Sequence, residues 1–114
     1  MKNSKPYDLE ERTFKFAREV ITLVNALPKN IPNGEIAKQV TRSAGSVGAD
    51  YIEANEALGK KNFLMKIRIC RKEAKESAYW LRLVSCSAET ESLREANELM
   101  KIFGAILQKS TGQA

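Results

Sequence analysis

The sequence predicts an all-α protein, an antiparallel up-down-up-down four-helix bundle. Apolar residues recur every three or four positions in four stretches, the segments between them are short, and no run alternates apolar and polar residues as a half-buried strand does. Helices joined by short turns run antiparallel to their neighbours. The 114 residues, 43% of them hydrophobic, suffice for a compact core, and we expect residues 1–114 to form a single domain.

The first helix opens with a capping pattern. Asp8, followed three residues later by Glu11, resembles a capping box with an aspartate in place of serine or threonine. We expect the helix to end at Pro28. Its predicted apolar residues are Leu9, Phe14, Ala17, Val20, Ile21, Val24 and Leu27.

Two prolines mark the turn at residues 28–33. Ile31 is expected to plug the end of the bundle, and Asn33 to cap the second helix. That helix is expected over residues 34–58, closed by Gly59. Its predicted apolar side comprises Ile36, Val40, Ala44, Val47, Tyr51 and Leu58.

Small residues interrupt the second helix. Gly45 and Gly48 together cost a helix about 2 kcal/mol relative to alanine, so we expect a partner that packs very close to this segment. A row lies opposite the apolar side: Arg42, Ser46, Ala49 and Glu53, flanked by Gly45. We predict that another subunit's helix crosses this row, with Arg42 and Glu53 making charged hydrogen bonds there. A small-ligand site and a thin solvated surface are the alternatives.

The third and fourth helices show the same periodicity. The third is expected over residues 60–85, and its predicted core stripe is Phe63, Ile67, Cys70, Ala74, Ala78 and Leu81. The fourth is expected to follow a cap at Ser87, with Glu89 and Glu91 near the positive end of the helix dipole. Its predicted core stripe is Leu93, Ala96, Met100, Phe103 and Leu107.

A basic sector distinguishes the third helix. Away from the core stripe, a sector of roughly 100° contains six cations and one aromatic residue. They are Lys61, Arg68, Arg71, Lys72, Lys75, Tyr79 and Arg82. With a net charge of +5, the chain should attract polyanions, and Tyr79 could stack on an unpaired base. The alternative is a solvated basic face. The sequence contains no glycine-rich RNA loop, zinc finger or helix-turn-helix pattern that would indicate a particular nucleic-acid target.

The remaining sector of the third helix is apolar: Met65, Ile69, Trp80, Leu83 and Val84. Because a contiguous apolar patch with the only tryptophan is typical of subunit contacts, we predict self-association through Met65, Ile69, Trp80 and Leu83. Alternatively, Trp80 packs under residues 28–33 or against the fourth helix. Lys66, Glu73 and Glu76 interrupt the sector. They would pair with a neighbouring chain in an oligomer and remain solvated in a monomer.

The composition argues against catalysis and metal binding. Without histidine, the chain lacks the commonest general base and the Glu-x-x-His ligand pairs of di-iron bundles. Cys70 and Cys86 lack metal-ligand spacing and are expected to be reduced and partly buried. The one carboxylate set to consider is Glu53, Glu56, Glu73 and Glu76, two of which alternate with lysines. We therefore expect no enzyme activity, no metal and no cofactor.

Two segments carry a family resemblance. QVTRSAGSVGADYIEA, at residues 39–54, and KKNFLMKIRICRKEAKESAYWLRLV, at residues 60–84, resemble the small proteins of the 23S rRNA intervening-sequence family over nearly the whole chain. The matching residues are Arg42, Ser43, Ser46, Ala49, Asp50, Ile52, Glu53, Phe63, Ala74, Glu76 and Leu81 to Leu83. Asp50 and Ala54 stand where the family commonly has asparagine and glycine, so recognition of a ligand by an amide at that place is not supported.

The resemblance implies an antiparallel four-helix bundle that assembles into a homopentamer. A related group is similar to the accessory proteins of diversity-generating retroelements, basic barrels that engage a reverse transcriptase and nucleic acid. By that analogy the basic sector faces outward or lines a channel, and the surfaces around Gly45 and Trp80 are buried between subunits.

The leading hypothesis is a non-enzymatic, self-assembling protein that binds RNA or other nucleic acid nonspecifically. The alternative is a protein-interaction scaffold, with a reverse transcriptase or a ribosome-associated protein as partner. Because no signal peptide and no apolar window of about 20 residues is present, we expect a cytoplasmic location without membrane contact.

Overall fold

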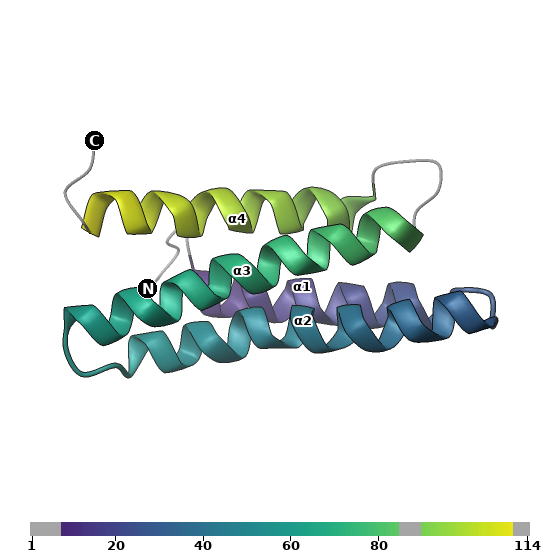
Figure 1. Ribbon diagram of the computed structural model, residues 1–114, viewed down its shortest axis with the longest axis horizontal. Coiled ribbons are helices and arrows are strands. Elements are labelled where there is room, and N and C mark those ends of the chain that lie inside the picture. The colour runs from purple at the N-terminus through teal and green to yellow at the C-terminus, as the bar shows by residue number, and fades with distance from the viewer. Residues whose placement is uncertain (1–7, 85–89, 111–114) are drawn as a thin grey trace.

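A computed structural model describes residues 8–84 and 90–110 of the chain, and within those ranges it contains four helices and no strand. The helices are α1 (Leu9–Asn25), α2 (Ile31–Asn55), α3 (Lys60–Val84) and α4 (Glu91–Ser110), as Figure 1 shows. The all-α, four-helix prediction is confirmed.

The start of α1 is as predicted, but its buried face differs. The backbone N–H of Glu11 donates a hydrogen bond to the Asp8 carboxylate at 3.3 Å. The buried residues are Leu9, Thr13, Phe16 and Val20. Phe14 and Ile21, which were expected in the core, are exposed, Phe14 to 55%. The reason is that α1 packs mainly on α2 and little on α4, so only a narrow row is covered, and that row runs through Phe16.

The turn into α2 corrects two expectations. The cap is Asn30 rather than Asn33: the Asn30 side chain accepts a hydrogen bond from the backbone N–H of Asn33 at 2.9 Å. The side chain of Asn33 instead donates to the carbonyl of Pro28, also at 2.9 Å, and ties the turn together. Ile31 is 89% exposed and plugs nothing within the described chain, because as the first helical residue it points away from the core.

The turn between α2 and α3 depends on one glycine. α2 ends at Asn55, so Leu58 lies beyond the helix and is 90% exposed rather than part of the core. Gly59 has a φ of +91°, a left-handed conformation that costs glycine little. Its carbonyl accepts a hydrogen bond from the N–H of Phe63 at 3.1 Å. Gly59 thus opens α3 rather than closing the last turn of α2.

The predicted core stripe of α3 is confirmed, with Phe63 partly buried and the other five residues buried. At the start of α4, the Thr90 hydroxyl accepts a hydrogen bond from the N–H of Leu93 at 3.1 Å. The predicted cap Ser87 and the neighbouring Glu89 lie outside the described residues. Leu99 belongs to the buried core, whereas Met100 is only partly buried.

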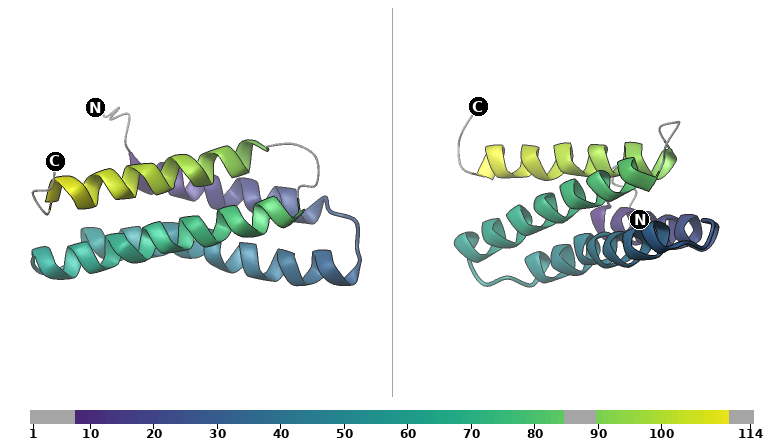
Figure 2. Two further views of the ribbon diagram at one scale, coloured as in Figure 1. Left: turned by 45° about the horizontal axis from the view of Figure 1, so that its top comes forward. Right: turned by 45° about the vertical axis from the view of Figure 1, so that its right-hand side comes forward.

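The arrangement gives α3 two different neighbours. α3 lies between α2 and α4, which Figure 2 shows from two further sides, and α1 and α4 share the least contact of any packed pair. Within residues 8–84 and 90–110, no helix combines the length and apolarity that crossing a membrane requires. The two flanks of α3 therefore contact different sets of side chains, those of α2 on one side and those of α4 on the other.

Candidate nucleic-acid interface

The seven residues of the predicted basic sector all lie at exposed positions of α3. We call them the basic stripe: Lys61, Arg68, Arg71, Lys72, Lys75, Tyr79 and Arg82. In the part of the chain that the structure describes, none of the six cations forms an ion pair with a carboxylate. Tyr79 is 54% exposed and stands edge-on to Trp80, with 5.0 Å between ring centroids. The stripe is accessible to a polyanion, and its role remains a prediction.

A cleft of about 520 Å³ lies between α3 and α4, next to the stripe. Arg68 and Arg71 line it from α3, and Lys101 and Gly104 line it from α4. A Cβ placed on Gly104 would lie 4.0 Å from Cδ and Nη1 of Arg71, so the arginine side chain passes over this glycine. Among the described residues that line the cleft, none is Asp or Glu.

Lys101 and Gly104 were not predicted to belong to the site. They are three residues apart on α4 and therefore share a side of that helix, which was readable from the sequence. Helical spacing does not say which neighbour that side meets, however. The missing information is how α4 crosses α3.

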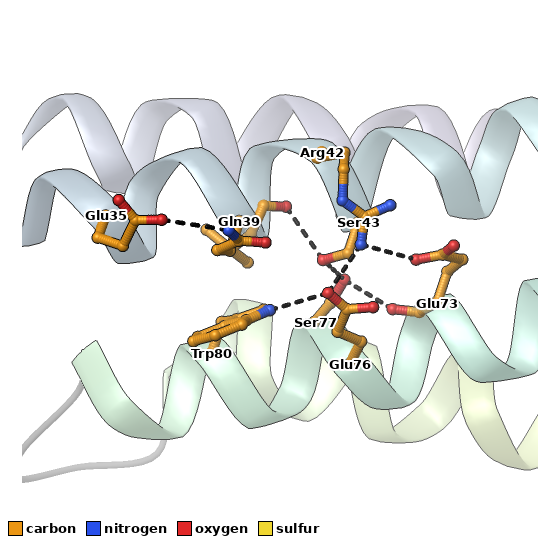
Figure 3. Close-up of polar contacts among 9 residues, drawn as sticks. Glu35, Gln39, Arg42, Ser43, Glu73, Glu76, Ser77 and Trp80 are labelled. Carbon is orange, nitrogen blue, oxygen red and sulfur yellow. Dashed lines mark hydrogen bonds and ion pairs between the residues drawn. The ribbon is translucent and has the colours of Figure 1, made fainter.

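The opposite flank of α3 carries an ion-pair network with α2 (Figure 3). Arg42 Nη2 lies 2.7 Å from Oε2 of Glu76 and 3.4 Å from Oε1 of Glu73. The indole Nε1–H of Trp80 donates to the same Glu76 oxygen at 3.1 Å. Glu73 is 7% exposed, so it is not the solvated residue expected in a monomer. Its charge is compensated inside the chain, by α2.

The network shifts the acid–base equilibria of its members. Burial alone would raise the pKa of Glu76, but the hydrogen bonds from Trp80 and Arg42 outweigh it, and the pKa lies below the ordinary glutamate value. The hydrogen bond with Glu76 is the main reason that the pKa of Arg42 is raised. Both charged states are therefore stabilised by the fold.

Beneath this network, two serines bring α2 and α3 close together. The hydroxyls of Ser43 and Ser77 are 2.8 Å apart and fully buried, and Ser77 also donates to the carbonyl of Glu73 at 2.9 Å. A buried hydroxyl needs such partners, since an unsatisfied one costs about 1–3 kcal/mol. Because both serines are fully buried and in contact, a larger residue at either position would have to displace its neighbours.

The close partner expected for the glycine segment of α2 is α1. A Cβ on Gly48 would lie 3.0 Å from Oγ1 of Thr13, whose hydroxyl is fixed by a hydrogen bond of 2.6 Å to the carbonyl of Leu9. A Cβ on Gly45 would meet nothing within 4 Å. Within the described residues, close packing explains the glycine at position 48 but not the one at position 45.

The predicted subunit-contact residues fall into two groups. Arg42 and Glu53 form ion pairs within the chain, the latter with Lys66 at 2.6 Å. The others are exposed (Gly45, Ala49, Met65, Leu83) or partly buried (Ser46, Ile69, Trp80). Their burial by a second copy of the chain remains a prediction.

Metal ligands and thiols are the remaining candidates for chemistry. Across residues 8–84 and 90–110, no cluster of three or more potential ligands among His, Cys, Asp and Glu could hold a metal ion. Cys70 is buried and unbonded, and burial raises the pKa of its thiol to about 12. A thiol in that state is a poor nucleophile at neutral pH. Cys86 lies outside the described residues.

Comparison with known proteins gives a consistent match. A family model described as 23S rRNA-intervening sequence protein matches residues 6–109. A crystal structure at 1.70 Å resolution, of a protein with unknown function from the S23 ribosomal protein family of Bacteroides thetaiotaomicron, is similar with a TM-score of 0.73 and 27% identity. The similarity covers 87% of this chain and 97% of that one. A comparison with curated proteins finds no match.

Proposed function

The chain belongs to the 23S rRNA-intervening sequence protein family, and from this premise we propose that it binds RNA, or another nucleic acid, without sequence specificity through the basic stripe of α3. One observation carries the proposal: six exposed cations share one helix face, and none is ion-paired with a carboxylate of the described chain. Cations that replace the counterions of phosphates supply affinity but read no sequence.

Ion pairs do form off the stripe, where five of the eleven described cations have a carboxylate partner. Arg12 pairs with Glu95, Arg42 with Glu76 and Lys66 with Glu53, each bridging two helices. Carboxylates are thus available between helices, yet they are placed away from the stripe. This distribution favours a role for the stripe with an anion from outside the chain.

The proposal includes assembly. The predicted antiparallel up-down order and the homopentamer implied by the family resemblance would repeat the stripe around a common axis, so that weak patches add in avidity. Support comes from Met65, which is 52% exposed, and from the similarly exposed Leu83 on the same helix. Light scattering should give a lower mass for Met65→Glu with Leu83→Glu than for Lys38→Glu. An unchanged mass would contradict this interface.

The binding proposal is tested by fluorescence anisotropy of labelled single-stranded RNA across a salt series. The variant is Arg68→Glu, Lys72→Glu, Lys75→Glu, and the matched control carries the same charge change off the stripe as Lys29→Glu, Lys38→Glu, Lys109→Glu. We expect affinity to fall with salt, and the slope of log K against log salt to lose about 2 units in the stripe variant. If both variants weaken RNA binding equally, only the net charge of the protein matters and the stripe is not the binding surface.

A second candidate is a protein-interaction scaffold, favoured by the exposed apolar residues Met65 and Leu83. Its partner would be a reverse transcriptase or a ribosome-associated protein, bound through an apolar contact with little salt dependence. Absence of RNA binding at low salt would favour this reading. The expectation that the protein is not an enzyme remains a prediction.

A further inference from the structure

Three positive charges converge on the cleft between α3 and α4. Arg68 and Arg71 are three residues apart on α3, and Lys101 reaches the same cleft from α4. Among the described residues, the carboxylate paired with Lys101 is that of Glu98, at 3.8 Å, and both side chains are well exposed. An exposed pair of this kind contributes little, so the charge of Lys101 remains available to a ligand.

The shape of the cleft suits a small anionic group with an apolar attachment. Its volume of about 520 Å³ lies in the range of small-ligand sites. Gly104 leaves the α4 wall without a side chain where Arg71 passes over it, while Ala105 and Leu107 provide an apolar part of the lining. A phosphate could sit among the cations while the adjoining sugar or base contacts the apolar part.

Charge selects among phosphates. A phosphate monoester carries about −1.5 to −2 at neutral pH, whereas a backbone phosphodiester carries a single negative charge. The planar guanidinium groups of two arginines can each bind two phosphate oxygens at once. Three cations in a cleft whose described lining contains no carboxylate therefore favour the monoester.

We propose that the α3–α4 cleft is a binding site for the phosphate monoester of a nucleotide, held by Arg68, Arg71 and Lys101. One source of such a monoester is the end of an RNA strand, and this version rests on the proposed function. The terminal phosphate of the RNA would occupy the cleft, and the phosphodiesters of the strand would follow the rest of the basic stripe. Lys61, Lys72, Lys75 and Arg82 belong to the stripe but do not line the cleft.

The test compares RNA probes of one sequence that carry a 5′-phosphate, a 3′-phosphate or only hydroxyl ends, each with an internal fluorophore. We expect at least one phosphorylated end to bind about tenfold more tightly than the hydroxyl-ended strand. Lys101→Glu should abolish this preference. Lys109→Glu, with the same charge change on the same helix but outside the cleft lining, should keep it.

A second arm separates the sources of the monoester. Calorimetry with adenosine monophosphate, on the native protein and on Lys101→Glu, detects a free nucleotide in the cleft. Lys101-dependent binding of the nucleotide without RNA binding would support the cleft and overturn the proposed function. Salt-dependent RNA binding with no end preference and no nucleotide binding would overturn the cleft and leave the proposed function standing. Absence of all binding would overturn both.

Discussion

Arginines lie at both flanks of α3, but their partners differ. On the side of α2, the cation Arg42 meets Glu73 and Glu76, and the two serines beneath them are hydrogen-bonded to each other. On the side of α4, Arg68 and Arg71 meet a lysine and a glycine around an open cleft. The two flanks differ in whether the chain itself supplies a carboxylate to neutralise the cation. One flank holds the fold together, and the other is available to a ligand.

The sharpest way to break this comparison is to overfill the packed flank. Ser77→Leu should lower the free energy of unfolding by about 3 kcal/mol, because the fully buried serine faces Ser43 at 2.8 Å. Denaturant unfolding followed by circular dichroism measures the change. Ser77→Ala, which loses a hydrogen bond but adds no volume, should cost about 1 kcal/mol. A leucine that costs no more than the alanine would mean that α2 and α3 are not closely packed here.

Removing one arginine from each flank sharpens the comparison. Arg42→Ala should cost about 2 kcal/mol, because Glu73 would keep its buried carboxylate without the guanidinium. Arg68→Ala should stay within about 0.5 kcal/mol of the native protein, because it forms no ion pair in the described chain. Equal losses in the two variants would contradict the division between the flanks.

Glycine substitutions measure how much room each contact leaves. Gly104→Ala should raise the free energy of unfolding by about 1 kcal/mol, because the added methyl makes ordinary contact with Arg71 and alanine favours the helix. Gly48→Ala should lower it by at least about 1 kcal/mol, because its methyl would press on Thr13. Thermal and denaturant unfolding compare the two. Stabilisation by both changes would show that α1 can shift away from α2.

Acid should weaken the α2 flank. Because the pKa of Glu76 is below the ordinary value of 4.5 in the folded chain, its contribution is complete above that value and is lost as the pH falls through the folded pKa. The effect should be smaller than that of Arg42→Ala. Denaturation midpoints across this pH range should show a shallower decline for Glu76→Gln than for the native protein. Identical declines would remove Glu76 from the acid response.

The sequence predicted what depends on spacing within one helix. The four helices, the core stripe of α3 and the exposure of the basic stripe follow from which residues share a face. The choice of Phe16 over Phe14 as the buried residue of α1 does not, because it depends on which face α2 covers. The same holds for the pairing of Arg42 within the chain and for the contribution of Lys101 to the cleft. Both depend on how helices cross.

The indole of Trp80 has a practical consequence. It is the single tryptophan of the chain, and its N–H is bound to the carboxylate that also holds Arg42. The intrinsic fluorescence of Trp80 therefore reports on the contact between α2 and α3. Loosening of that contact should change the wavelength and intensity of the tryptophan emission, so no attached dye is needed.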